Sequence, residues 1–355
     1  MKVIKAFGPQ DLRIVEVATP EPGPGQILIK VRASGICGSD KWIWSVGQAI
    51  DDVVGHEVAG EVTALGTNVT SFSVGDRVMV NNVGGCGDCS ACRAGAFVLC
   101  ICREKSPGDV NNGYGEYVVA PAVNCAKILP GLDFIDGALI MDNWGTPYAG
   151  LLRGGASLYG TGVNSAGVNG AGFSGVGPGI DVLINGCGPI GQAAISLAKA
   201  FGAYVIATDP IPWRREVALK SGANVVVAPE ELTKAAHKLT NGLGVHLVLE
   251  CSGDGNAYQH CFESLRNQGT IVTIGENAEF TFRPSDQVLR RALSVVGTWY
   301  STMAQAGELM QLALQNRINV KSFLTHKVSL EEVPGLFGSI VARDPGMMKC
   351  VVVFD

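Results

Sequence analysis

DVLINGCGPIG, residues 181–191, is the stretch that decides the fold of this chain. Its first five residues are typical of a buried strand, and its glycines have the spacing G-x-G-x-x-G. The sequence that follows predicts a helix over 192–201 and a second strand over 203–208, which ends at Asp209. In a chain with 47 glycines the glycine pattern alone would be a weak signal, but its position between a strand and a helix makes it specific.

This order of strand, glycine turn, helix, strand and acid predicts a dinucleotide site. The glycines let the backbone approach a pyrophosphate at the helix N-terminus, and the acid binds ribose hydroxyls. Asp209 should also repel a 2′-phosphate, which favours NAD over NADP, although Arg214 and Arg215 follow it and could neutralise it or contact adenosine. The residues predicted to hold the phosphates are Gly186, Gly188, Pro189, Ile190 and Gly191.

The periodicity on both sides of this unit predicts an α/β chain with two domains. Between 146 and 302, apolar strands such as 270–274 alternate with helices such as 257–266, which is typical of a doubly wound parallel sheet. Residues 1–145 are instead rich in short strands and turns, and a helix is predicted over 303–315. A chain of 355 residues is long enough for two such domains.

Four closely spaced cysteines form the second informative pattern. Cys86, Cys89 and Cys92 follow one another at intervals of three residues, and Cys100 comes eight residues later. Four thiolates can close a tetrahedron around one Zn²⁺, and a closed site of this kind is structural because it leaves no position for substrate. Two disulfides or four unrelated thiols are the alternative, but a cysteine cluster in a reducing compartment favours metal.

A third group of residues suits a catalytic metal. Cys37 lies in a Cys-Gly-Ser-Asp turn, and His56 follows nineteen residues later between Gly55 and Glu57. A thiolate, an imidazole and a carboxylate suit a zinc ion whose fourth position stays open. A lone histidine is more often a hydrogen-bonded structural residue, but the residues that flank His56 favour a ligand.

Charge and hydropathy exclude several classes of partner. A net charge of −5 argues against nucleic acid and anionic membrane as partners. The long apolar stretch 182–207 is interrupted by glycines, a proline and Lys199, so it predicts a buried unit rather than a membrane span. The first residues show no signal-peptide core, and we therefore expect a cytoplasmic protein with no membrane partner.

With these features in this order, the chain resembles the zinc-containing medium-chain alcohol and polyol dehydrogenases, in particular their sorbitol- and threonine-dehydrogenase-like branch. The resemblance implies a GroES-like β-rich catalytic domain of residues 1–145 and 303–355 and an NAD-binding Rossmann domain of residues 146–302. It also implies a homodimer or homotetramer. The segments that carry the resemblance are 22–31, 55–62, 74–78, 112–117 and 250–253.

The same resemblance implies roles for individual residues, with two Zn²⁺ per subunit. The family usually has Glu or Cys as the third ligand of the catalytic zinc, and this chain has Asp142 at that place. The competing carboxylate is Glu57, which would be either an exchanging ligand or a base beside the metal. Ser39 either starts a proton relay or is a turn hydroxyl. The further cofactor contacts that we expect are Arg214, Cys251, Ser252, Ile274, Gly275 and Thr298.

The implied reaction is hydride transfer between NAD(H) and a small-molecule secondary alcohol or ketone. A polyol, sugar or cyclitol is the first expectation, and a bulky hydrophobic cyclic alcohol of the terpenoid type is the second. A non-catalytic nucleotide-binding homologue is the remaining alternative. The aromatic residues expected to line the substrate cleft are Trp42, Trp44, Trp144, Trp299 and Tyr300.

One segment departs from the family pattern. Residues 153–179 contain ten glycines, and the family usually has a much shorter link here, so part of the segment looks inserted. A tolerated surface loop is one interpretation, since long loops cost little extra closure entropy. A flap over the cleft or a subunit contact is the other.

Overall fold

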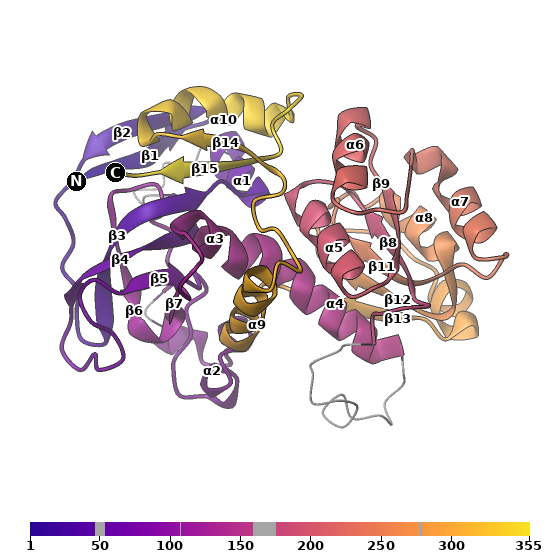
Figure 1. Cartoon of the computed structure of the whole chain (residues 1–355), viewed down its shortest axis with the longest axis horizontal. Helices are drawn as coiled ribbons and strands as arrows, with labels where there is room; N and C mark the ends of the chain where they lie inside the picture. Colours follow the sequence, from indigo (N-terminus) through magenta and orange to yellow (C-terminus); the bar gives the residue numbers. More distant parts are fainter. Residues whose placement is uncertain (47–53, 107, 159–174, 277–278) are drawn as a thin grey trace. The chain divides into compact units, whose positions relative to one another are not determined.

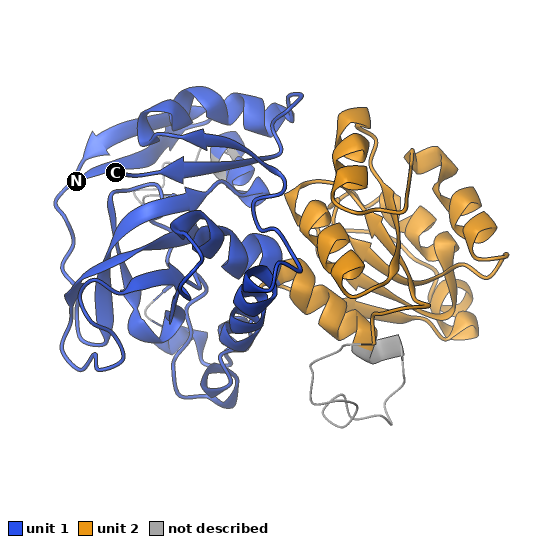
Figure 2. Cartoon of the chain, in the orientation of Figure 1, with its two compact units in different colours: residues 1–145, 301–355 blue, residues 146–300 orange. Residues whose placement is uncertain are grey.

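The computed structural model describes residues 1–46, 54–106, 108–158, 175–276 and 279–355. Most of the glycine-rich segment, residues 159–174, therefore lies outside the described residues. The chain divides into two compact units, which Figure 2 shows in different colours. Unit 1 comprises residues 1–145 and 301–355, and unit 2 comprises residues 146–300.

Unit 1 is built on β-strands (Figure 1). Within its described residues, the larger sheet has the order β14-β15-β3-β4-β5-β7, β6 pairs with β3 outside this path, and β1 pairs with β2 in a separate sheet. The strands are β1 (Lys2–Gly8), β2 (Asp11–Glu16), β3 (Gln26–Gly35), β4 (Glu57–Leu65), β5 (Arg77–Val80), β6 (Tyr117–Pro121), β7 (Cys125–Lys127), β14 (Leu324–Val328) and β15 (Lys349–Val353).

Several helices of unit 1 are very short, and one helical segment is irregular. The α-helix α3 continues directly into a π-helical turn, η5, which gives residues 134–144 a change of helical pitch. The helical segments are η1 (Gly38–Asp40), α1 (Lys41–Val46), α2 (Ser90–Arg93), η2 (Phe97–Leu99), η3 (Arg103–Lys105), η4 (Ala122–Asn124), α3 (Phe134–Leu139), η5 (Ile140–Trp144), α9 (Met303–Leu314), η9 (Leu330–Glu332) and α10 (Val333–Ala342).

Strand β3 organises the core of unit 1. It pairs with β4, β6 and β15, and its inward residues Ile27, Ile29 and Val31 are fully buried with the valines of β4. Gly60 of β4 lies so close to β3 that a Cβ there would come within 2.1 Å of the Lys30 carbonyl oxygen. Tight pairing of β3 with β4 therefore depends on a glycine, and it determines which residues meet at the ends of the two strands.

Unit 2 is a doubly wound sheet, as predicted. Its described residues form a six-stranded sheet of order β10-β9-β8-β11-β12-β13, in which all the paired strands are parallel. In Figure 1, α5 and α6 lie on one side of this sheet and α7 and α8 on the other. The strands are β8 (Asp181–Asn185), β9 (Tyr204–Thr208), β10 (Val225–Val227), β11 (Val245–Glu250), β12 (Leu265–Thr273) and β13 (Ser294–Gly297).

The helices of unit 2 follow the strands in the expected alternation. They are α4 (Gly145–Leu158), which begins at the last residue of unit 1, α5 (Pro189–Ala200), α6 (Pro212–Lys220), η6 (Pro229–Glu231), α7 (Leu232–Leu239), α8 (Ala257–Ser264), η7 (Pro284–Val288) and η8 (Leu289–Arg291). Strand β8 lies between β9 and β11, so the chain order reverses at its carboxyl end. Ligands of such sheets bind in the crevice at this reversal point.

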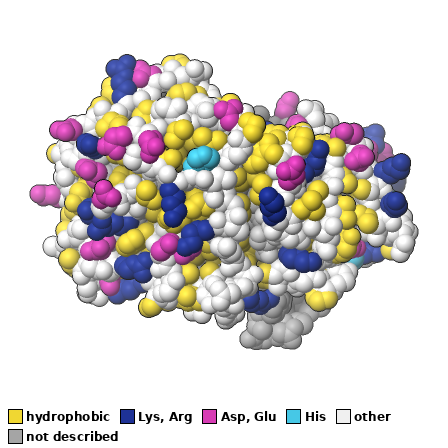
Figure 3. Space-filling model, turned by 45° about the horizontal axis from the view of Figure 1, so that its top comes forward, with side chains coloured by type: hydrophobic (Ala, Val, Ile, Leu, Met, Phe, Trp, Pro, Cys, Tyr) yellow, Lys and Arg dark blue, Asp and Glu magenta, His cyan; other side chains and the backbone are white. Residues whose placement is uncertain are grey.

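The surface agrees with the modest charge of the chain. Figure 3 shows basic and acidic side chains interspersed over one face, with no large area of a single sign. Among the described residues, none of the helices combines the length and the apolar character that a membrane crossing requires.

Candidate functional site

Four potential metal ligands converge in unit 1. The ligand atoms of Cys37, His56, Glu57 and Asp142 all lie within 4.8 Å of one another. Cys37 comes two residues after β3 ends, His56 directly precedes β4, and Asp142 is the middle residue of the π-helical turn η5. The pairing of β3 with β4 thus brings Cys37 and His56 together, and the irregular turn presents Asp142 to them. Single π-turns of this kind often occur at functional sites.

The contacts within this cluster fit a bound cation. Asp142 Oδ2 lies 3.2 Å from His56 Nε2 and 3.8 Å from Cys37 Sγ. The buried Nε2 atom of His56 is thus within ion-pair distance of Asp142 but has no hydrogen bond of good geometry among the described residues. Burial would lower the pKa of His56, but the nearby Asp40 and Cys37 raise it well above its ordinary value. Surroundings that draw a proton onto an imidazole also attract a metal cation, and the S, N and O donor set suits zinc.

The orientation of His56 depends on a residue to which the sequence assigned no role. Asp40 Oδ1 lies 3.2 Å from His56 Nδ1, while Asp40 Oδ2 accepts from Cys37 N at 2.9 Å and from the Tyr114 hydroxyl at 2.5 Å. Burial would raise the pKa of Asp40, but His56 and these hydrogen bonds hold it below its ordinary value. A carboxylate behind a ligating histidine fixes its tautomer. The sequence signal that could have indicated a role for Asp40 was its position three residues after Cys37, in the same Cys-Gly-Ser-Asp turn.

Glu57 is held by a buried lysine. Lys349 Nζ lies 2.5 Å from Glu57 Oε1 and also donates to the Ile36 carbonyl, and both side chains are at most 1% exposed. Burial raises the pKa of Glu57, although the Lys349 charge opposes this shift. Gly35 pairs with Glu57 across the two strands, and a Cβ on Gly35 would lie 2.0 Å from Glu57 Oε2, so only glycine leaves room for the carboxylate. No sequence signal pointed to Lys349.

The other residues predicted near this cluster differ in their surroundings. Ser39 is exposed on η1. Trp144 is fully buried, donates to the Val320 carbonyl and stacks on Phe323, so the prediction that it lines a substrate cleft is wrong. Trp44 packs against Phe337 in the core of unit 1. Trp42 is 55% exposed and stays available to a ligand.

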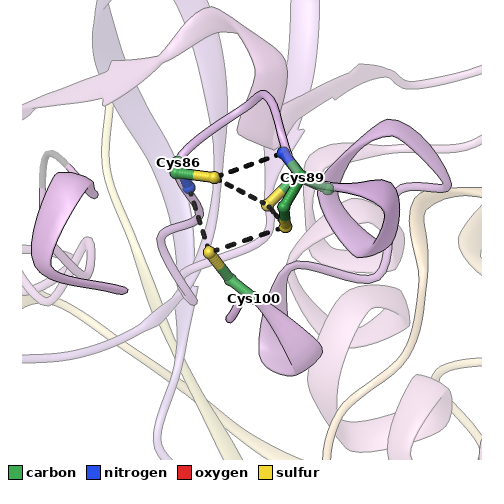
Figure 4. A group of neighbouring side chains, drawn as sticks. Cys86, Cys89 and Cys100 are labelled. Carbon is green, nitrogen blue, oxygen red and sulfur yellow. Dashed lines mark hydrogen bonds between the residues drawn. The ribbon is translucent and has the colours of Figure 1, made fainter. Parts of the chain in front are cut away.

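The four cysteines of the loop 86–100 form a second group, and Figure 4 labels three of them, Cys86, Cys89 and Cys100. Cys89 Sγ lies 3.5 Å from Cys92 Sγ and 3.9 Å from Cys100 Sγ, and Cys86 Sγ lies 3.9 Å from Cys92 Sγ. Four sulfurs at a Zn–S distance of about 2.3 Å would be separated by about 3.8 Å from one another. The spacing of the four sulfurs therefore fits a tetrahedral zinc site.

Backbone groups of the loop also prepare these thiols. The N–H groups of Cys92 and Ile101 lower the pKa of Cys89 to about 6, and the N–H groups of Cys89 and Asp88 lower the pKa of Cys86. Burial instead raises the pKa of Cys92 to about 12. Thiolates are the form that binds metal, and backbone donors that stabilise thiolates are typical of such sites.

In unit 2, the glycine turn has the geometry of a phosphate-binding loop. Gly186 has φ +93° and packs against the backbone of Ser252, while a Cβ on Gly191 would lie 1.9 Å from the Gly186 carbonyl oxygen. Helix α5 begins at Pro189, directly after the turn. The first backbone N–H groups of a helix have no partner inside the helix and can bind an anion.

Asp209 is attached to this turn. It is buried, its Oδ2 accepts from Cys187 N at 2.8 Å, and its Oδ1 accepts from Ile211 N at 2.8 Å. Arg215 donates to the carbonyls of Asp209 and Pro210 rather than to the carboxylate. Arg214 is buried, and its guanidinium lies over the ring of Trp213. Its Nη1 atom lies 3.8 Å from the position that a Cβ on Gly188 would occupy.

The remaining predicted cofactor residues lie at the same edge of the sheet. Ser252 donates to the carboxylate of Glu250, and Cys251 N donates to the Asn185 carbonyl. Ile274 and Gly275 both donate to the Glu250 carbonyl, and Thr298 donates to the Thr273 carbonyl. All the predicted residues therefore gather around the carboxyl ends of β8, β9, β11, β12 and β13.

Comparisons with known proteins identify the family of both parts of the chain. The profile of the alcohol dehydrogenase GroES-like domain matches residues 23–130, and that of the zinc-binding dehydrogenases matches residues 189–315. L-threonine 3-dehydrogenase of Pyrococcus horikoshii is 32% identical over 92% of this chain and 90% of its own length. L-threonine 3-dehydrogenase of Alteromonas mediterranea is 32% identical over 93% of each chain.

Solved structures are similar over almost the whole chain. Alcohol dehydrogenase TADH from Thermus sp. ATN1 is 25% identical with a TM-score of 0.86, covering 99% of both chains. A putative zinc-binding dehydrogenase from Sinorhizobium meliloti 1021, bound to NADP, is 26% identical with a TM-score of 0.79, also over 99% of both chains. The predicted combination of a GroES-like domain with a Rossmann sheet is thereby confirmed, and this chain belongs to the zinc-containing medium-chain dehydrogenase/reductase family.

Proposed function

We propose that this protein transfers hydride between NAD(H) and a secondary alcohol or ketone, with zinc at the catalytic cluster. The observation that carries the proposal is the convergence of Cys37, His56 and Asp142 in one buried cluster. Residues 1–145 and 303–355 would form the catalytic domain and residues 146–302 the NAD-binding domain.

Within the cluster, Cys37, His56 and Asp142 would be the primary ligands, and Glu57 would approach the metal only in exchange for another ligand. The pairing of Glu57 with Lys349 supports this division, because that carboxylate already has a cation. Bound zinc would supply a Lewis acid that lowers the pKa of the substrate hydroxyl, and the nicotinamide would accept the hydride. Ser39, exposed two residues after Cys37, would pass the released proton towards solvent.

The second zinc ion would be structural. Cys86, Cys89, Cys92 and Cys100 would hold it in a closed tetrahedron, which the sulfur spacing supports. Such a site needs reduced thiols, so we also propose a cytoplasmic location for the protein. We further propose a homodimer or homotetramer, which light scattering would test.

For the cofactor, we propose NAD rather than NADP. The Asp209 carboxylate is buried beside the glycine turn and bonded to it, where it can accept from ribose hydroxyls and repel a 2′-phosphate. The contacts of Arg215 with carbonyl oxygens support this choice, because they direct its charge away from the carboxylate.

For the substrate, we propose a small polar secondary alcohol, with a polyol, sugar or cyclitol as the first candidate. A β-hydroxy amino acid such as L-threonine is the second candidate, favoured by the 32% identity to L-threonine 3-dehydrogenases over most of the chain. The terpenoid alternative has less support than the sequence suggested, because Trp144 is fully buried and Trp44 is partly buried against the core of unit 1.

The experiment that tests this function measures NAD⁺ and NADP⁺ reduction by a panel of polyols, cyclitols, L-threonine and terpene alcohols. We expect one polar secondary alcohol to be oxidised by wild-type protein and by the control Cys102→Ser, while Cys37→Ser loses most of kcat/KM. Binding of NADH without reaction on any alcohol would contradict the proposal and favour the non-catalytic alternative.

A further inference from the structure

Tyr114 lies behind the catalytic cluster without belonging to it. Its side chain is fully buried, and its hydroxyl donates to Asp40 Oδ2 at 2.5 Å. Asp40 in turn faces His56 Nδ1 through its other oxygen, Oδ1, at 3.2 Å. Three buried side chains thus form one line that ends at a proposed zinc ligand.

The backbone around Tyr114 supports the same histidine. Gly113 N donates to the Gly55 carbonyl at 2.8 Å, and Tyr114 N donates to the Val54 carbonyl at 2.7 Å. Gly55 has φ +96°, and a Cβ there would lie 2.6 Å from the Tyr114 ring. The two residues that precede His56 are therefore held by Tyr114 and its neighbour, so both the main chain and the ring of His56 depend on this segment.

The hydroxyl decides which oxygen of Asp40 faces the histidine. Oδ2 already accepts from Cys37 N and from the Tyr114 hydroxyl, which leaves Oδ1 for His56. A carboxylate opposite Nδ1 keeps the proton on that nitrogen and leaves the Nε2 lone pair for a metal. Without the Tyr114 hydroxyl, Asp40 Oδ2 would accept only from Cys37 N. Rotation of the carboxylate would then cost less free energy.

We infer that Tyr114 is a positioning residue, whose hydroxyl fixes the Asp40 carboxylate and thereby the tautomer and direction of the zinc ligand His56. The inference rests on the zinc site proposed above. Its chemistry is that of a hydrogen-bonded chain: the phenol acts through Asp40 and has no contact with metal or substrate. The alternative is an aromatic residue that only fills the core beside Gly55.

The test compares Tyr114→Phe with the control Tyr117→Phe. The control removes a phenol hydroxyl from the same segment, at a residue that is not fully buried. Zinc release from the catalytic site to a chelator and the visible spectrum of the cobalt-substituted protein are the readouts. We expect Tyr114→Phe to weaken zinc binding about 10-fold, the lower end for partners around a metal ligand, and to change the cobalt spectrum. Tyr117→Phe should behave as wild type.

A double-mutant cycle separates positioning from packing. If the hydroxyl acts through Asp40, Tyr114→Phe should have no further effect on zinc release in an Asp40→Ala background, whereas independent effects would add. Additive effects, or wild-type zinc release and cobalt spectrum in Tyr114→Phe, would overturn the inference. A failure of the proposed function would look different, because wild-type protein itself would then hold no zinc at Cys37 and His56. Zinc retained by Cys86–Cys100 reports that each variant is folded.

Discussion

At the scale of single residues, the two carboxylates of the proposed catalytic cluster have different partners. Asp142 Oδ2 faces His56 Nε2, whereas Glu57 Oε1 is paired with Lys349. Zn²⁺ with one thiolate and one carboxylate is neutral, and a third permanent anion would work against lowering the pKa of a bound alcohol. These contacts make separate outcomes for the two carboxylates testable.

We predict that Asp142→Asn markedly weakens zinc binding at the proposed catalytic site, because it replaces the proposed anionic ligand with a neutral one. Glu57→Gln should keep its zinc and slow turnover about 10–100-fold, the usual range for groups beside the ligands. Metal analysis and kcat are the measurements, with Glu61→Gln on the same strand as control. Retained zinc and activity in Asp142→Asn would reverse the assignment.

The second prediction at the scale of single residues concerns Asp209 and the choice between NAD⁺ and NADP⁺. Asp209→Ala removes the charge that we propose opposes a 2′-phosphate, together with the acceptor for Cys187 N and Ile211 N. We therefore expect the ratio of kcat/KM for NAD⁺ to that for NADP⁺ to fall, mainly because KM for NAD⁺ rises. Asp254→Asn, at an exposed position of the same unit, serves as control. Equal wild-type kcat/KM for both nucleotides would show that Asp209 does not discriminate.

At the scale of elements, the helical segment that presents Asp142 is anchored at its beginning. Asp133 and Asp136 form a capping box at the start of α3, and Lys321 Nζ lies 2.8 Å from Asp133 Oδ2 and 3.1 Å from Asp136 Oδ2. Burial would raise the pKa of Asp133, but Lys321 lowers it below its ordinary value. A residue of the C-terminal tail thus stabilises the helix that leads to η5.

We predict that Lys321→Ala lowers the free energy of unfolding by at most about 1 kcal/mol at neutral pH, because the pair is partly exposed. The pKa of Asp133 is lowered in the folded state, so its pairing with Lys321 contributes to the free energy of unfolding above the ordinary pKa of about 3.9. This contribution is lost as the pH falls through the lowered pKa of the folded state. Urea unfolding should therefore show the two proteins converging in acid, with Lys327→Ala as control. A difference that grows in acid would contradict this.

At the scale of the whole molecule, we predict two zinc ions per chain, because the two ligand groups share no residue. Cys92→Ser should reduce the count to one and lower the melting temperature, since it removes a ligand of the closed site, while the zinc at Cys37 and His56 remains. Metal analysis and calorimetry on protein prepared without chelators provide the measurements. A wild-type count of one or none, or loss of both ions in Cys92→Ser, would contradict two independent sites.

The sequence by itself determined the features that depend on neighbours along the chain. Strand 181–185 forms as predicted, and the second strand begins at Tyr204, one residue later than predicted. The glycine motif was readable because its three glycines are close in sequence. A Cβ on Gly186 or Gly191 would meet backbone, and Gly188 is the N-cap of α5. The cysteines of the loop 86–100 are likewise near neighbours, so their spacing alone indicated a common site.

Only the tertiary structure decided which distant residues meet. Lys349 reaches Glu57 across 292 positions because β3 pairs with both β4 and β15, and Asp142 reaches Cys37 across 105 because the turn η5 packs beside the end of β3. No local spacing records either meeting. The roles of Asp40 and Tyr114 also depend on this sheet and on the segment that packs against Gly55. Trp144 looked available in sequence but is buried, because hydrophobicity suits a core and a binding cleft equally and only packing distinguishes them.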